Sequence, residues 1–311
     1  MADERALRGE KIVTVLGATG QQGSAVATAL LGAGWRVRAL VRDPSSARSR
    51  HLAGAGVETV PGDYADPASL RSAFDGVYGV FSVQPSSGQA GSGVTDEDEV
   101  AYGTSVADIA QSAGVAHLVY SSAIAAGETD TGIGHFDSKS RIEAHINDLT
   151  IAATIIRPAS FMDILLLPGM GLAVGRISFL MAAEQPMQFI AVPDIGSIVA
   201  EVFATPEEFR YRTIDLAGDE LTGHELAHQL SNAVGRPITY ERMSAELLAS
   251  NELLARLADA VDTGRLAGNA DLPALRARFP ILHRFGDWLA GLDEAMIANA
   301  MQPVEHGVAL R

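Results

Sequence analysis

Residues 11–23 read KIVTVLGATGQQG, and this stretch decides the fold. The continuous apolar run KIVTVL is typical of a strand that is buried on both faces of a parallel sheet. Glycines 17, 20 and 23 follow it, and a helical segment follows the glycines. Strand, tight turn and helix in this order are characteristic of a dinucleotide-binding turn, in which the helix N-terminus receives the pyrophosphate. The predicted cofactor contacts here are Gly17, Thr19, Gly20, Gln21, Gln22 and Gly23. A turn whose glycines serve geometry alone is the alternative.

Short apolar runs alternate with helical stretches as far as residue 160. After the first strand at 11–16, strands are expected at 35–41, 57–60, 78–83, 117–121 and 153–157. Helices are expected between them at 21–33, 44–54, 67–75, about 97–113 and about 137–148. This alternation predicts an α/β protein with a doubly wound parallel sheet of the Rossmann type.

The pattern becomes irregular after residue 160. Strand-like segments at 187–192, 212–218 and 238–243 are mixed with helices near 194–204 and 223–234, and further helices follow to about residue 300. We therefore predict a Rossmann core at 1–160 and a smaller C-terminal α/β lobe at 161–311, with some segments returning to the core sheet. Ligands bind at the carboxyl ends of strands in such folds, here in a cleft between the lobes.

Charge and composition exclude several classes of partner. The chain of 311 residues carries 38 acidic and 23 basic side chains, a net charge of −15, with no run of Lys or Arg. Nucleic acids and anionic membrane surfaces require a basic patch, so neither is expected as a partner. The absence of cysteine excludes disulfides and thiolate metal sites. Because the N-terminus also lacks a signal-peptide pattern, a cytoplasmic location is expected. The apolar window 161–182 is interrupted by Asp163, Pro168 and Arg176 and is expected to be buried or to line a pocket.

The residue after the second strand selects the dinucleotide. Arg42 stands there, where an NAD enzyme would place a carboxylate, and it can bind a 2′-phosphate. NADP(H) is therefore expected over NAD(H), although Asp43 argues the other way. After the third strand, Asp63 either flanks the adenine or caps a turn. Strand ends supply further cofactor contacts at Ser82, Gln84 and Pro158, and substrate-pocket walls at Phe161 and Met162, which as core residues would look the same.

These motifs together resemble the NmrA-like family of atypical short-chain dehydrogenases/reductases. The resemblance rests on GATGQQG, RVRALVRDP, GDYADPASLRSAFDGVYGVF, AGVAHLVYSS, HFDSKSRIEAHI, TIIRPASFMD, VPDIG and DLPALRARFPILHRFGDWL, and it covers nearly the whole chain. It implies an NADP(H)-binding domain with a small C-terminal lobe. The family combines NADPH-dependent reductases of quinones and benzylic ethers with members that bind NADP(H) and act as redox sensors.

The resemblance also points to residues 135–139 as a catalytic segment. Ordinary short-chain dehydrogenases use a Tyr-x-x-x-Lys pair on one helix face, together with a serine. This chain has Lys139, one of its two lysines, and Ser121 or Ser122, but His135 stands in the tyrosine position. Lys139 is expected to contact the nicotinamide ribose and to serve as proton donor, or His135 donates the proton instead. In the remaining alternative, Lys139 only anchors the cofactor and His135 only begins the helix.

Two other patterns are interpreted as structural. His224-Glu225-Leu226-Ala227-His228 spells H-E-x-x-H, but Thr222 and Glu225 form a capping box and the histidines lie away from the core face, so no metal site is expected. Residues 96–99, Asp-Glu-Asp-Glu, follow a Thr95 cap and stabilise the first turn of a helix. Glycine-rich loops at 86–96 and 125–134 are either plain connections or a lid over the cleft.

Two functions remain open. The first is an NADPH-dependent reductase of a small conjugated substrate such as an enone, a quinone or an imine. The second is an NADP(H)-sensing regulator without turnover that acts through a protein partner. Either function is compatible with a homodimer. The missing tyrosine favours the sensor, whereas Lys139, the serines and the apolar cleft favour the reductase.

Overall fold

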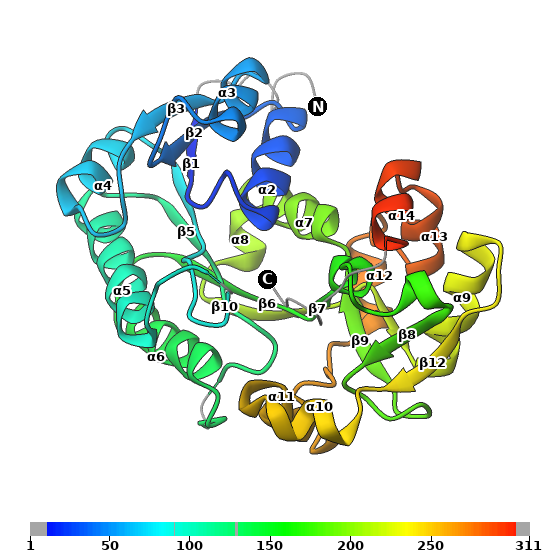
Figure 1. The fold of residues 1–311 in the computed structure, drawn as a ribbon. Helices are drawn as coiled ribbons and strands as arrows, with labels where there is room; N and C mark the ends of the chain where they lie inside the picture. Colours follow the sequence, from blue (N-terminus) through cyan, green and yellow to red (C-terminus); the bar gives the residue numbers. More distant parts are fainter. Residues whose placement is uncertain (1–10, 90, 128–129, 303–311) are drawn as a thin grey trace.

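A computed structural model describes residues 11–89, 91–127 and 130–302 of the chain. Its centre is a seven-stranded, all-parallel sheet in the order β10-β6-β5-β4-β1-β2-β3 (Figure 1). The first six strands are β1 (Ile12–Val15), β2 (Arg36–Val41), β3 (Glu58–Pro61), β4 (Gly79–Ser82), β5 (His117–Ser121) and β6 (Ala153–Pro158). The order reverses at β1, which lies between β2 and β4. The predicted doubly wound parallel sheet is confirmed.

Helices connect the strands as predicted and cover both faces of the sheet. They are α2 (Gln21–Gly32), α3 (Ala47–Gly54), α4 (Pro67–Phe74), α5 (Asp96–Ser112) and α6 (Gly134–Asp148). Helices α4, α5 and α6 lie in a row along one face, and α2 lies on the other (Figure 1). The sequence placed the start of α6 near residue 137, but it begins at Gly134, so His135 lies within its first turn.

Alternate residues of the central strands enter two separate cores. Val15, Phe81 and Val119 pack toward α2, whereas Val80 and Leu118 pack toward α4, α5 and α6. All five side chains are fully buried. Strands that are buried on both faces explain why the sequence shows continuous apolar runs instead of polar–apolar alternation.

Part of the C-terminal half belongs to the core. Strand β10 (Arg212–Leu216) extends the sheet beside β6, and α7 (Val192–Ala204) packs directly against α2. These two segments of the C-terminal half thus lie with the core sheet and its helices. The short helix α8 (Pro206–Phe209) connects α7 to β10.

The remaining C-terminal segments form the smaller lobe, along the right and the bottom of Figure 1. One small sheet contains β7 (Ser160–Phe161), β9 (Met187–Ile190) and β11 (Asp219–Leu221), and another pairs β8 (Arg176–Phe179) with β12 (Thr239–Arg242). The lobe also contains the 3-10 turns η1 (Met162–Leu166) and η2 (Leu172–Val174). Its helices are α9 (Gly223–Val234), α10 (Ala245–Ser250), α11 (Glu252–Asp262), α12 (Leu272–Arg278), α13 (Phe285–Ala290) and α14 (Glu294–Ala300).

The H-E-x-x-H segment lies at the start of α9 and is used as predicted. Thr222 and Glu225 form a reciprocal capping box, with the Thr222 hydroxyl accepting from the Glu225 N–H and the Glu225 carboxylate accepting from the Thr222 N–H. His224 is exposed and lies 2.9 Å from Glu184. Within the described ranges, no group of three or more His, Cys, Asp or Glu side chains is arranged to hold a metal ion.

The apolar window 161–182 is broken into short elements of the smaller lobe. It contains β7, η1, η2 and β8, and Leu165, Met170 and Ile177 are fully buried. Among the residues that the structure describes, no helix has the length and apolarity needed to cross a membrane.

The contact between α2 and α7 depends on Gly196. A Cβ atom at this position would lie 2.4 Å from the backbone oxygen of Ala25 on α2. We expect Gly196→Ala to lower the free energy of unfolding by about 2 kcal/mol, because the two backbones must separate. Urea unfolding measures this loss. Gly54→Ala is the matched control, since nothing lies within 4 Å of its Cβ position, and it is expected to leave stability nearly unchanged. Equal stability of the two variants would contradict the predicted close contact.

Candidate functional site

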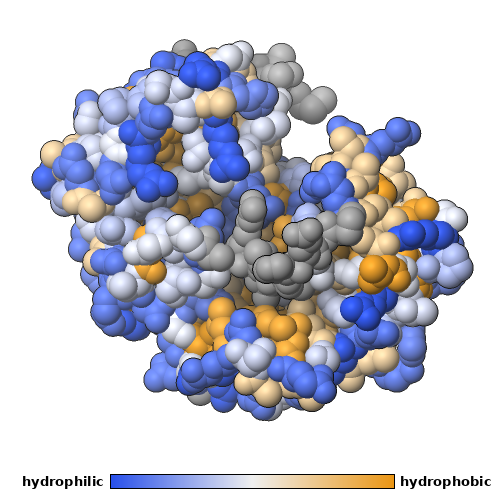
Figure 2. Space-filling model, in the orientation of Figure 1, coloured by the Kyte–Doolittle hydropathy of each residue, from blue (hydrophilic) through white to orange (hydrophobic). Residues whose placement is uncertain are grey.

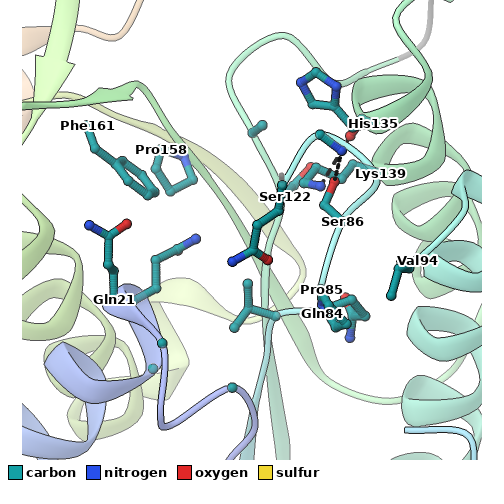
Figure 3. Close-up of a pocket in the computed structure, with 18 of the residues that line it drawn as sticks. Gln21, Gln84, Pro85, Ser86, Val94, Ser122, His135, Lys139, Pro158 and Phe161 are labelled. Carbon is teal, nitrogen blue, oxygen red and sulfur yellow. Dashed lines mark hydrogen bonds between the residues drawn. The ribbon is translucent and has the colours of Figure 1, made fainter. Parts of the chain in front are cut away.

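A cavity of about 620 Å³ lies at the carboxyl ends of the central strands and extends under the smaller lobe. Figure 3 shows Lys139, His135 and Ser122 along one wall of it, and Gln21, Pro158 and Phe161 facing them from the other side. Loops after β1, β2, β3 and β4, the first turns of α2 and α6, and residues of α11 all contribute to the lining. The predicted cleft between the core and the C-terminal lobe is therefore present.

Most of the predicted site residues line this one cavity. Of the predicted cofactor, catalytic and pocket residues, those that line it are Gly17, Thr19, Gly20, Gln21, Gln22, Gly23, Arg42, Asp63, Gln84, Ser122, His135, Lys139, Pro158 and Phe161. Ser82, Ser121 and Met162 are not among the lining residues. The structure thus brings together residues that are more than 140 positions apart in the sequence.

The glycine turn is closed by backbone contact. Gly17 has φ +65°, and the N–H of Gly20 donates to its carbonyl oxygen at 2.8 Å. A Cβ atom on Gly23 would lie 2.3 Å from the same oxygen. No side chain caps the N-terminus of α2, and no acidic residue lies in its first turn. The turn therefore leaves helix N–H groups and the positive end of the helix dipole for an anion.

Two arginines give the same end of the cavity a positive charge. Arg42 and Arg48 both line it, and within the described part of the chain neither forms an ion pair with a carboxylate. The neighbouring Asp43 is the residue that would disfavour a 2′-phosphate. Its carboxylate already accepts two hydrogen bonds from Ser45, one from the backbone N–H at 2.8 Å and one from the hydroxyl at 2.6 Å. Asp63 lines the cavity and also caps its own turn by accepting from the Ala65 N–H at 2.9 Å.

Buried polar atoms without partners lie farther along the cavity wall. The Gln84 amide nitrogen donates to Ser82 at 2.7 Å, but the Gln84 Oε1 atom has no hydrogen-bond partner. The buried Ser122 hydroxyl also has none. Buried polar groups are rarely left unpaired, so these two atoms are available to hydrogen-bond a polar molecule in the cavity. Ser82 is buried, accepts the hydrogen bond from Gln84 and does not line the cavity, so its predicted contact with the cofactor stays a prediction.

The structure also separates the two candidate serines. Ser121 is buried and donates its hydroxyl hydrogen to Gln22 Oε1 at 2.6 Å, which links β5 to the first turn of α2. The Ser121 hydroxyl is therefore used inside the fold and does not line the cavity, so its catalytic role stays a prediction. Ser122, one residue later, faces the cavity (Figure 3).

Lys139 is held by a buried carboxylate that the sequence did not reveal. Its ammonium group forms an ion pair with Glu99 and donates to the backbone oxygen of His135 at 3.2 Å. Glu99 is only 1% exposed, and its second oxygen accepts from Ser138 at 2.8 Å. The interpretation of residues 96–99 as nothing more than a stabilised helix turn is therefore incomplete. Thr95 and Asp98 do form a capping box.

His135 lies beside Lys139 in a largely buried position. Burial lowers the pKa of the imidazole to about 4, and the positive charge of Lys139 acts in the same direction. The ring packs on Phe136 with 4.2 Å between the ring centroids. At neutral pH the imidazole is therefore uncharged, so it can donate a hydrogen bond but does not carry an extra proton.

The other end of the cavity is apolar. Its walls come from the smaller lobe, namely Phe161, Ile164, Phe179, Leu180, Met243, Leu253, Leu257 and Leu266. Figure 2 shows apolar side chains gathered at this side of the molecule, over α10 and α11. The sequence analysis missed Met243 and the leucines, although the spacing of Leu253, Leu254 and Leu257 on α11 was a detectable signal. Met162, predicted to line the pocket, is fully buried in the core and does not line the cavity; it begins η1, directly after β7 ends at Phe161.

Comparison with known proteins identifies the family. The model of the NmrA-like family matches residues 9–264. The chain belongs to the NmrA-like family. It is 30% identical over 257 residues to an NmrA-like family domain-containing oxidoreductase, hkm9, of Aspergillus hancockii, covering 76% of each chain. It is 29% identical over 236 residues to an NAD(P)H azoreductase of Xenophilus azovorans, covering 76% of this chain and 78% of that protein.

A solved structure supports the fold of this NmrA-like protein. NmrA, a negative transcriptional regulator crystallised in complex with NAD, superimposes with a TM-score of 0.77 over 93% of this chain and 97% of that one. At 18% identity, this similarity shows a common Rossmann-type fold and no more.

The lowered pKa of His135 predicts a pH-dependent stability. The imidazole titrates near pH 6.5 in the unfolded chain and near pH 4 in the folded protein, so the unfolded state binds more protons between these values. Stability is therefore lost as the pH falls through this range. We expect wild type to lose about 2 kcal/mol more than His135→Gln between pH 7 and pH 5, measured by urea unfolding. His117 also has a pKa of about 4, but it is present in both proteins, so it contributes equally to the loss of stability in each. Identical losses would contradict the assignment.

Proposed function

We propose that this NmrA-like protein is an NADPH-dependent reductase of a small, conjugated acceptor such as an enone, a quinone or an imine. One observation carries the proposal. A single cavity joins the glycine turn and two arginines at one end to an apolar pocket at the other, with Lys139 and Ser122 facing it between them. The similarity to an oxidoreductase and to an NAD(P)H azoreductase supports the same reaction class.

We infer that residues along the whole length of the cavity would hold the dinucleotide. The turn Gly17–Gly23 would hold the pyrophosphate, and Arg42 and Arg48 would bind the 2′-phosphate. Asp63 and Tyr64 would flank the adenine, while Gln84, Pro158 and Lys139 would lie along the nicotinamide half. When bound, the cofactor supplies a hydride. The unpartnered Gln84 and Ser122 oxygens are the observation that supports this fit.

Lys139 has one donor left for a ligand. An ammonium group carries three N–H bonds, and Glu99 and the backbone oxygen of His135 take two of them. The third N–H and the Ser122 hydroxyl are the polar groups that can orient a carbonyl or ribose hydroxyl. Since His135 is uncharged at neutral pH, it does not act as a strong acid. An acceptor whose reduced form is a stabilised anion needs only a weak one, which favours conjugated substrates.

A cofactor-sensing regulator is the second candidate. His135 in place of the usual tyrosine and the pairing of Lys139 with Glu99 both leave the site without a strong proton donor. The fold shared with a transcriptional regulator is compatible with this function. Such a protein would act through a protein partner, and it would bind NADPH without oxidising it.

Arg42 is expected to determine the preference for NADPH over NADH. Arg42→Ala removes the charge expected at the 2′-phosphate, so we expect the Kd for NADPH to rise about tenfold or more while that for NADH changes little. Titration of cofactor fluorescence measures both. Arg71→Ala removes the same charge from an exposed position on α4, outside the cavity, and is expected to change neither constant. Equal weakening of NADPH and NADH by Arg42→Ala would contradict the 2′-phosphate assignment.

Turnover separates the reductase from the sensor. We expect wild type to oxidise NADPH, followed by absorbance, with at least one of a panel of quinones, enones and imines. Lys139→Ala is expected to lower kcat/KM at least a hundredfold, since it removes a charged hydrogen bond at the cofactor. His135→Phe is expected to retain most of the activity, because the imidazole is uncharged at neutral pH and packs on the ring of Phe136. Tight NADPH binding without turnover on any acceptor would favour the sensor, and failure to bind either cofactor would overturn both functions.

A further inference from the structure

We propose that Glu99 is a positioning residue of the site: it holds the Lys139 ammonium group in place from behind, so that one N–H points to the ligand. The inference rests on the proposed function, because the ligand of Lys139 is the cofactor or the substrate. It concerns a residue of α5 that lies outside the cavity and that the sequence pattern placed in an ordinary helix cap.

Burial makes Glu99 unusual among its neighbours. Its side chain is 1% exposed, and Lys139 is 13% exposed toward the cavity. The carboxylate has two partners, both on α6: Lys139 on one oxygen and Ser138 on the other, at 2.8 Å. A buried carboxylate is costly unless it is paired, so this arrangement fixes both members of the pair.

The other acidic residues in the first turn of α5 are used elsewhere. Asp98 caps the helix with Thr95. Glu97 forms two hydrogen bonds with Arg141, at 2.7 and 2.8 Å, on the exposed side of the α5–α6 contact. Asp96 accepts from Ser87 of the preceding loop. Glu99 is thus the member of this turn that reaches the cavity lysine, and Glu97 provides a matched ion pair that does not.

The remaining charged and titratable groups around the pair do not replace Glu99. On α6, His135 is uncharged at neutral pH, and Glu143 is paired with Arg157 at 2.5 Å. On β5, the Tyr120 hydroxyl is buried without a partner, and burial together with the charges of Glu99 and Glu143 raises its pKa. Removing Glu99 therefore leaves Lys139 without a carboxylate to hold it and free to move.

Amine labelling tests the inference directly, because the chain has only two lysines. Lys11 precedes β1, at the opposite end of the strand from the cavity, and serves as an internal reference. Acetic anhydride labelling at pH 8, followed by mass spectrometry, gives the rate at Lys139 relative to Lys11. The proteins compared are wild type, Glu99→Gln and the control Glu97→Gln, each with and without NADPH.

We expect Glu99→Gln to label at Lys139 at least fivefold faster than wild type without NADPH and to bind NADPH about tenfold more weakly, as for the loss of one charge-assisted contact. Glu97→Gln is expected to match wild type in both. A Glu99→Gln protein with wild-type labelling, or with unchanged or tighter NADPH binding, would overturn the inference. If NADPH neither binds nor protects Lys139 in wild type, the proposed function fails, whereas labelling without NADPH still decides whether Glu99 holds the lysine.

If Glu99→Gln does not fold, melting temperatures provide a second test of the pairing between Glu99 and Lys139. If Glu99 acts through Lys139, Lys139→Met leaves a buried unpaired carboxylate and melts lower than wild type, and adding Glu99→Gln to it raises the melting temperature again. A double variant that melts no higher than Lys139→Met would contradict the pairing.

Discussion

The position of helix α2 depends on two close backbone approaches that only glycine allows. On one side, Gly23 lies against the carbonyl of Gly17, where a Cβ would stand 2.3 Å from the oxygen. On the other side, Gly196 of α7 meets Ala25 at a corresponding 2.4 Å. The first contact sets the turn that would take a pyrophosphate, and the second fixes the helix on the sheet. Because Ser121 also bonds to Gln22 on the same helix, the candidate site follows from where α2 is held.

Charge in the site is arranged differently from charge in the rest of the molecule. The chain has a net charge of −15, yet three of its cationic side chains, Arg42, Arg48 and Lys139, line the cavity. The two arginines are left without carboxylate partners in the described ranges, as suits groups that bind an anionic ligand. Lys139 is instead paired with a buried Glu99. A point charge beside the expected nicotinamide is thereby oriented, while the arginines remain available to a phosphate.

Features that repeat along the chain, or that are formed by residues close together in it, could be predicted from the sequence. The βα alternation gave the sheet and its helices, and the glycine spacing gave the turn between β1 and α2. Long-range side-chain pairing was not predictable. Nothing in the run Asp96–Glu99 distinguishes Glu99, since its burial depends on how α5 packs against α6. The same applies to Ser121, the last residue of β5, and to Ser122, which follows it: the Ser121 hydroxyl bonds to Gln22 inside the fold, whereas Ser122 lines the cavity. Met162 was misplaced because β7 ends at Phe161 and the chain turns there into η1.

Hydrogen exchange with and without NADPH would test most directly whether these separate segments form one cofactor site. The account predicts simultaneous protection in the turn of residues 17–23, in the segment after β2 that contains Arg42 and Arg48, and in the first two turns of α6, which include Lys139. Peptides from α9 and α12, whose residues do not line the cavity, are expected to exchange at unchanged rates. Protection confined to other segments, or no protection at saturating NADPH, would contradict the account.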